Sequence, residues 1–188
     1  KDQILMLDSQ RDSIAVALKK LGYSMNSRNK KELEEAKIEL LKQKPLVLAY
    51  VGDEVKDIMV GEEAALAVVW SGDAVAMMEE NENLEYVIPK EGGNLWFDSM
   101  IIPTTSKHPK EAQAFIDFMC RPDVALRNTE YIEYSTPNKG AVKQLPDDWQ
   151  NNRVAYPPDK ELSNCEIFND PGVFVIEYDR IWTDIIAE

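Results

Sequence analysis

Short apolar runs alternate along most of the chain with stretches whose apolar residues recur at helical spacing. Residues 4–7 form an uninterrupted apolar run, and the apolar residues between positions 14 and 18 recur with the period of a helix. Ser9 stands where a helix N-cap is expected, and Gly22 stands near the end of the same stretch. The chain is therefore predicted to open with a strand followed by a helix.

The same alternation continues to about residue 102 and then gives way to helices. The predicted strands span residues 46–51, 65–70, 84–89 and 95–102. The predicted helices span residues 30–43, 53–60, 71–78, 107–119, 124–131 and 172–186, with a loop-rich stretch at 135–159. Because strands alternate with helices, the predicted fold class is α/β, with a mostly parallel sheet flanked by helices.

Charge narrows the range of ligands. The 188 residues carry a formal net charge of −13, and the pI is about 4.6. Nucleic acids and anionic membrane surfaces are not expected partners, because both require clustered Lys and Arg. Residues 51–100 carry 12 acidic and two basic side chains, hence ten of the thirteen net negative charges. A solvated face explains most of these acids, but such a surface also favours cationic ligands.

Residues that commonly carry catalysis or bind metals are scarce. The chain has one histidine, His108, and lacks a phosphate-binding glycine loop, a His-Glu-x-x-His motif and a Gly-x-Ser-x-Gly motif. We therefore expect no catalytic residue, no metal site and no cofactor. Two cysteines, Cys120 and Cys165, are too few for a disulfide framework, and the sequence leaves their pairing open.

Tryptophans next to acidic residues and glycines form the first candidate site. Trp96 and Asp98 are two residues apart, so a strand would place both side chains on one face. Trp70 begins a Trp-Ser-Gly-Asp sequence at the end of another predicted strand. An aromatic ring beside a carboxylate suits a ligand with an apolar stem and a cationic head. The alternative is that both tryptophans belong to the core and Asp98 caps a turn.

Two further groups allow both a structural and a binding role. Ser9 and Asp12 have the spacing of a capping box at a helix start, but loops after parallel strands also bind ligands. Asp8, at the end of the first predicted strand, fits either role. Tyr134 begins a Tyr-Ser-Thr-Pro-Asn sequence that could line a pocket or form an ordinary turn.

Several segments, in this order, resemble the C-terminal part of the spermidine/putrescine-binding proteins of ABC transporters. The matching stretches are residues 5–8 with Arg11, then 17–24, 69–72, 89–99, 121–125 and 134–138. The Lys-Glu-Gly-Gly and Trp-x-Asp-Ser pieces, together with Tyr-x-Thr-Pro-Asn, carry most of the specificity. The resemblance covers nearly the whole chain.

The resemblance implies a type II solute-binding protein, in which a polyamine lies in a cleft between two α/β lobes. Aromatic rings of that family sandwich the methylene chain, and carboxylates hold the ammonium groups. The ligand-binding residues it implies are Trp70, Trp96, Asp98 and Tyr134, with Asp12 where the family commonly has a Glu; Asp8 and Ser9, at the end of the first predicted strand, complete the candidate set. Ser9 stands where the family can carry a second acid, and Phe168 stands where a polar Gln can contact the ligand. These two departures leave the preference between spermidine and putrescine open.

The resemblance also implies a domain organisation and partners. Residues 1–95 would form the distal lobe, and residues 96–188 would return to a first lobe whose opening half lies outside the chain. The expected partners are a polyamine and the permease subunits of the transporter, at the periplasmic or extracellular face of the cell membrane. A tether to that membrane through a preceding segment is compatible with this organisation.

Three alternatives to polyamine binding stay open at this point. The same fold could bind another small cationic or amino-acid-like ligand. A glycoside hydrolase could use stacked tryptophans, with Asp12 and Asp98 as acid and base. The chain could also be a folded lobe that binds nothing on its own.

Overall fold

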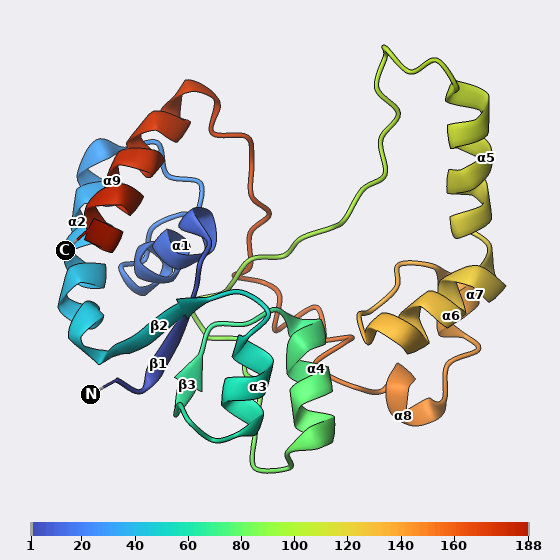
Figure 1. Ribbon diagram of the computed structural model, residues 1–188, viewed down its shortest axis with the longest axis horizontal. Helices are drawn as coiled ribbons and strands as arrows, with labels where there is room; N and C mark the ends of the chain where they lie inside the picture. The colour runs from blue at the N-terminus through green and yellow to red at the C-terminus, as the bar shows by residue number, and fades with distance from the viewer. Residues whose placement is uncertain (1, 188) are drawn as a thin grey trace.

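A three-stranded parallel sheet with helices on both faces forms the larger part of the computed structural model, which describes residues 2–187 (Figure 1). The strands are β1 (Ile4–Leu7), β2 (Val47–Val51) and β3 (Leu66–Ala67), in the order β2-β1-β3. Leu5 lies opposite Ala49 on one side and Ala67 on the other. Because all pairs are parallel, the three strands end at the same edge of the sheet.

Adjacent side chains of β1 enter two different hydrophobic cores, because strand residues point alternately to opposite faces. Met6 lies in a core formed with three helices, and Leu5 lies in a second core formed with two others. The first three helices are α1 (Gln10–Lys20), α2 (Lys30–Gln43) and α9 (Val175–Ala187). The other two are α3 (Val55–Val60) and α4 (Ser71–Glu80), on the opposite side of the sheet in Figure 1.

The ends of the first two helices follow from local sequence. Gly22, directly after the last turn of α1, has a φ of 80°, a left-handed conformation that glycine adopts without strain. Asn29 caps α2 by accepting a hydrogen bond of 3.0 Å from the backbone N–H of Lys31. Pro45 lies in the 3₁₀ helix η1 (Lys44–Leu46), which ends α2 and leads into β2.

The C-terminal helix α9 packs against residues from the N-terminal part of the chain. A 3₁₀ turn, η2 (Gly172–Phe174), leads into α9, whose buried residues Tyr178, Ile181 and Ile185 pack in the same core as Met6. The Tyr178 hydroxyl donates a hydrogen bond of 2.8 Å to the Ser27 carbonyl oxygen, and the Met25 carbonyl oxygen lies 3.3 Å from the same hydroxyl. These contacts tie α9 to the loop between α1 and α2.

The remaining helices lie apart from the sheet and are reached by an extended segment (Figure 1). They are α5 (Pro109–Met119), α6 (Pro122–Ile132), α7 (Lys139–Val142) and α8 (Asp147–Gln150). We call residues 97–163 the helical arm, and residues 2–92 with 168–187 the body. No residue of α5 is buried, and its Phe115, together with Ile101 of the extended segment, borders an open groove of about 250 Å³.

The predicted helices are present, and so are the strands predicted at 46–51 and 65–70. The strands predicted at 84–89 and 95–102 are wrong. Residues 84–89 and 95–102 do not pair with a strand in the described part of the chain; a single parallel bridge, between Asn94 and Glu166, lies just before the second of these ranges. A β-like run becomes a strand only where another backbone edge can pair with it. Leu84 and Tyr86 instead pack against the core that contains Leu5.

Two segments, residues 93–96 and 164–167, connect the body with the helical arm. The division into residues 1–95 and 96–188 stays a prediction; within the second of these ranges, α9 packs on α1 and α2.

Cys120 and Cys165 are both free thiols. Among residues 2–187, no helix is both long enough and apolar enough to cross a bilayer.

Replacing Ile181 by Ala is expected to lower the free energy of unfolding by about 2–5 kcal/mol, because it opens a cavity in the core around Met6. Urea denaturation followed by circular dichroism measures this loss. Ile176→Ala, on the exposed side of the same helix, is the matched control and should cost less than about 0.5 kcal/mol. Equal losses in the two variants would contradict the position of α9.

Candidate functional site

A tyrosine from the helical arm packs against the first turn of α4 in the body. A Cβ atom added to Gly72 would lie 2.1 Å from Cδ2 of the Tyr134 ring, far inside van der Waals contact. Only glycine therefore allows this ring to lie on the backbone of α4. The contact brings Tyr134 next to Asp73, the acidic residue in the first turn of the same helix.

Trp96 completes an aromatic pair with Tyr134. The two ring centroids are 5.7 Å apart and the ring planes meet at 60°, an edge-to-face arrangement. Trp70 is the extended residue directly before α4, so it lies in the turn that leads to Gly72 and Asp73. Trp70, Trp96 and Tyr134 are all partly buried, so each ring keeps some surface for contact with a ligand.

Asp73 is a buried carboxylate with one open oxygen. The residue is 6% exposed, and its Oδ1 lies 3.5 Å from Nζ of Lys56 in α3. Among the described residues, no donor forms a hydrogen bond with Oδ2. The N-terminus of α4 favours a negative charge at this position. A buried acceptor without a donor is costly, so this oxygen is suited to an N–H group brought by a ligand.

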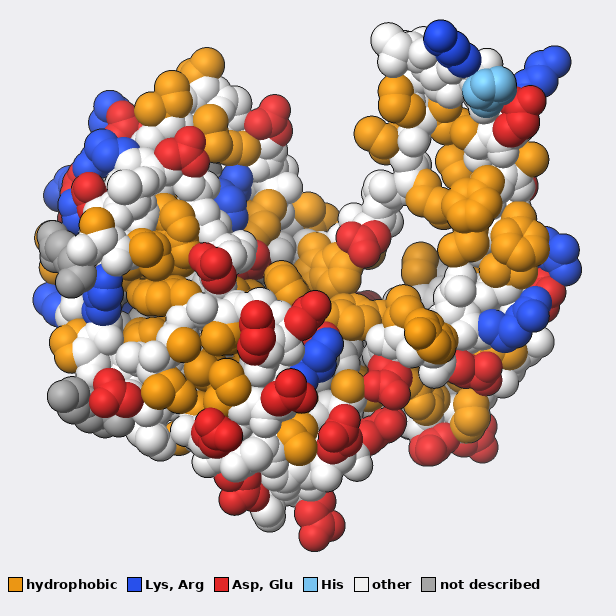
Figure 2. Space-filling model, viewed as in Figure 1, with side chains coloured by type: hydrophobic (Ala, Val, Ile, Leu, Met, Phe, Trp, Pro, Cys, Tyr) orange, Lys and Arg blue, Asp and Glu red, His pale blue; other side chains and the backbone are white. Residues whose placement is uncertain are grey.

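The electrostatics of this corner are negative. Burial and the charge of Asp73 raise the pKa of the Tyr134 phenol. Burial and the neighbouring Glu79 and Glu80 raise the pKa of the Glu133 carboxyl in the same way. Lys56 is the only Lys or Arg between positions 51 and 89. Figure 2 shows acidic side chains gathered over the α3–α4 side, with hydrophobic side chains exposed where the body meets the arm.

A second polar group lies at the end of β1. The Ser9 hydroxyl donates a hydrogen bond of 2.6 Å to Oδ2 of Asp12, and Nδ2 of Asn94 donates one of 3.4 Å to Oδ1. The Ser9 side chain does not accept a bond from the helix backbone, so the pair is not a capping box. Asp8 is exposed, and its backbone N–H continues the pairing with β2.

Residues 94–96 link the two groups. Asn94 contacts Asp12, and Trp96 contacts Tyr134, from positions two residues apart. An extended chain advances about 3.3 Å per residue, so the two groups are neighbours. In the described part of the chain, Oδ1 of Asn94 is also a buried acceptor without a donor. The structure therefore brings together Asp12, Trp96 and Tyr134 of the predicted residues, with Ser9 and Trp70 beside them.

The expected geometry of Asp98 is wrong in one respect. The predicted strand that would align Asp98 with Trp96 on one face is not formed, because residues 95–102 have no pairing strand. Asp98 is exposed, and it forms no hydrogen bond or ion pair within residues 2–187. Its role as a ligand carboxylate stays a prediction.

Sequence reasoning missed Asp73 and Asn94. Asp73 follows Trp70-Ser71-Gly72 and resembles an ordinary acid in the first turn of a helix; the structure buries it and places Tyr134, 61 positions away, next to it. Phe168, noted as a departure from the polyamine-binding family, has its ring 4.5 Å from the guanidinium carbon of Arg11. Phe168 thus contributes a cation–π contact inside the protein.

Comparison with known proteins gives a consistent set of similarities. The sequence model of the family described as "Bacterial extracellular solute-binding protein" matches residues 1–156. The spermidine/putrescine-binding periplasmic proteins of Salmonella typhimurium (strain LT2) and Escherichia coli (strain K12) are 40% and 36% identical over 187 residues. The alignment covers 100% of this chain and 54% of each of these proteins, so the chain spans about half of their length.

Two solved structures have the same fold. A putative spermidine/putrescine ABC transporter protein from Listeria monocytogenes superimposes with a TM-score of 0.93 and 42% identity. The spermidine/putrescine ABC transporter substrate-binding protein PotD from Streptococcus pneumoniae gives a TM-score of 0.84 and 38% identity. The matches cover 99% and 100% of this chain, and 58% of each of the other chains. The α/β fold of solute-binding proteins predicted from the sequence is confirmed.

Replacing Asp73 by Asn is expected to lower the pKa of the Tyr134 phenol, because the substitution removes a negative charge that disfavours the phenolate. Burial remains, so the pKa should stay above its ordinary value. The ring resonances of Tyr134 in an NMR titration at alkaline pH measure the change. Asp57→Asn, an exposed acid on α3, is the control and should leave this pKa unchanged. An unchanged pKa of Tyr134 in the Asp73→Asn variant would contradict the placement of the two side chains next to each other.

Proposed function

The chain belongs to the family of bacterial extracellular solute-binding proteins, and from this premise we propose that it forms part of the substrate-binding component of a polyamine ABC importer. The observation that carries the proposal is a pair of open acceptors beside an aromatic pair. Asp73 Oδ2 and Asn94 Oδ1 are buried without donors, and Trp96 and Tyr134 lie next to them. Spermidine and putrescine, which the relatives' names give as their ligands, carry groups that match both features.

The chemistry of the match is direct. Each ammonium group of a polyamine offers charge-assisted N–H donors, which form stronger hydrogen bonds with carboxylates than neutral donors do. The methylene chain between these groups packs against aromatic faces, and the rings also attract the cations. Asp12, which contacts Asn94, and Asp73, next to Tyr134, supply carboxylates for more than one ammonium group. Asp98, on the same segment as Trp96, is the third candidate carboxylate.

The position of the site between body and arm suggests how binding proceeds. Tyr134 comes from the arm, whereas Asp12 and Asp73 come from the body, so a ligand at this position contacts both. Approach of the arm to the body around the ligand would exclude water. Excluding water strengthens every ammonium–carboxylate interaction, because the local dielectric constant falls. The closed form would then dock on the permease subunits of the transporter.

The proposal includes the setting of the protein. A protein with this role acts outside the cytoplasmic membrane, in the periplasm or at the extracellular face, as the relatives' names indicate. It delivers its ligand unchanged and is not an enzyme. These statements concern the whole protein, of which this chain corresponds to about half of the relatives' length.

Putrescine and spermidine should quench or shift the tryptophan fluorescence in a saturable titration, because Trp70 and Trp96 lie in the site. Asp12→Asn, Asp73→Asn and Asp98→Asn should each weaken the affinity by more than about tenfold, since each removes the partner of an enclosed ammonium group. Asp57→Asn is the control and should bind as the unchanged chain does.

The titration is run on this chain and on a version extended to the length of the relatives. A response in the extended version alone would mean that the site needs residues outside the chain. The absence of a response to either polyamine in both versions would refute the proposed ligand class. Raising the salt concentration should weaken binding, because screening reduces attraction between charges.

A further inference from the structure

The two segments that connect body and arm, residues 93–96 and 164–167, are called the crossing segments, and they meet at one point. Asn94 and Glu166 form a parallel bridge in which the Leu95 N–H donates to the Glu166 carbonyl at 2.8 Å, and the Glu166 N–H donates to the Gly93 carbonyl at 3.0 Å. The backbones are packed closely here. Gly92 has a φ of 90°, and a Cβ on it would lie 1.9 Å from the Asn164 carbonyl oxygen. The two crossing segments therefore form one unit.

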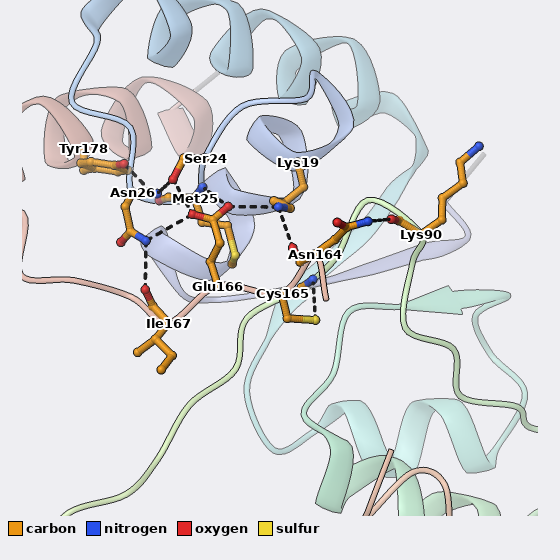
Figure 3. Close-up of polar contacts among 11 residues, drawn as sticks. Lys19, Ser24, Met25, Asn26, Lys90, Asn164, Cys165, Glu166, Ile167 and Tyr178 are labelled. Carbon is orange, nitrogen blue, oxygen red and sulfur yellow. Dashed lines mark hydrogen bonds and ion pairs between the residues drawn. The ribbon is translucent and has the colours of Figure 1, made fainter. Parts of the chain in front are cut away.

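The Glu166 side chain attaches this unit to the body. Its Oε1 accepts hydrogen bonds from Lys19 Nζ at 3.0 Å and from the Met25 N–H at 3.2 Å. Its Oε2 accepts from the Ser24 hydroxyl and from Nδ2 of Asn26. Figure 3 shows these four donors converging on one carboxylate from α1 and the loop that follows it.

Further bonds strengthen the attachment. Lys19 Nζ also donates to the Asn164 carbonyl at 2.9 Å, and Asn26 Nδ2 donates to the Ile167 carbonyl at 2.9 Å. Asn164 Nδ2 in turn donates to the Lys90 carbonyl at 2.8 Å (Figure 3). Although burial alone would raise it, hydrogen bonds from Ser24, Lys19 and Met25 lower the pKa of the Glu166 carboxyl. The carboxylate thus stays charged at neutral pH.

Among the described residues, no hydrogen bond joins residues 97–108 to the body. On the other side, the Cys165 N–H donates to the Leu162 carbonyl at 2.9 Å, so the polar contacts of residues 157–163 stay within the arm or reach the neighbouring segment 164–167. The arm touches the body through apolar and aromatic side chains instead: Tyr134 lies on Gly72, and Val154 packs against the core that contains Leu5. The polar attachment near the junction is therefore concentrated at Glu166.

We infer that Glu166 is the positioning residue that anchors both crossing segments to the body. The anchored side is α1 with its following loop, and the segment that carries Trp96 leaves directly from it. The anchor determines the orientation of the arm with or without a ligand. It can therefore be tested separately from polyamine binding.

Distances between two spin labels test the anchor. One label is placed on Cys120, which is exposed in the arm, and the other on a Lys31→Cys substitution in α2, whose side chain is 84% exposed. A Cys165→Ser substitution in every variant avoids a third label and keeps an acceptor for the Gly93 N–H. Double electron–electron resonance then gives the distribution of distances between arm and body.

Glu166→Gln should broaden this distribution for two reasons. The neutral side-chain amide of Gln attracts the Lys19 ammonium group less, and its own N–H donors would face the donors that bonded the carboxylate. Amide exchange at Leu95 and Glu166 should become at least about tenfold faster, since hydrogen bonds to a charged group are stronger than those to a neutral one. The amides of α2 should keep their protection. A merely structural role would slow or speed exchange throughout the body without widening the distance distribution.

Glu91→Gln is the matched control. Glu91 and Glu166 border one cavity of about 330 Å³, but the ion-pair partner of Glu91 is the neighbouring Lys90 at 3.9 Å. A Glu166→Gln distribution as narrow as that of Glu91→Gln would overturn the inference. If Glu166→Gln also loses the protection of α2, Lys19→Met decides. A broader distribution in Lys19→Met supports the anchor, and an unchanged one refutes it.

Discussion

A short strand that separates two hydrophobic cores places the candidate site. Leu5 and Met6 are fully buried on opposite faces of β1, so neither the register nor the tilt of this strand can change without exposing apolar surface. The chain must therefore leave the sheet at Asp8, and the polar residues that follow lie at the carboxyl edge. The parallel strand β3 leads to Trp70 and α4 at the same edge. Ligands of open α/β sheets bind at such edges.

The charge of the site follows from the same arrangement. The acids near the junction come from α1, from α4 and from Glu133, the residue that follows α6, and Asp73 forms an ion pair with Lys56. A folded protein keeps a buried acceptor open only where the surrounding packing is favourable enough to offset it. Here the packing is that of Tyr134 on Gly72 and of Trp96 on Tyr134. The aromatic contacts of Tyr134 and the unpaired Oδ2 of Asp73 are thus parts of one arrangement.

Local patterns predicted the helices, since spacing and caps within one segment determine them. The helix at residues 30–43 could be predicted from its Glu, Lys and Leu residues and from Pro45, which follows it. The strands proposed at 84–89 and 95–102 failed because a strand needs a partner elsewhere in the chain, which no local pattern reveals. Of the residues that the structure brings together at the candidate site, Asp12, Trp96 and Tyr134 were predicted, partly through family resemblance. Asp73 and Asn94 were missed, because their neighbours Tyr134 and Asp12 are distant from them in the sequence.

The exposed apolar side of α5 bears on the colloidal behaviour of the chain. Phe115, Phe118 and Ile101 remain open to water along one side of the arm, and contiguous apolar surface of this kind favours association between molecules. The net charge of −13 opposes that association by mutual repulsion. Because salt screens repulsion but leaves apolar attraction intact, the chain in isolation is most soluble in dilute buffer. The same salt that loosens a cationic ligand also brings the molecules together.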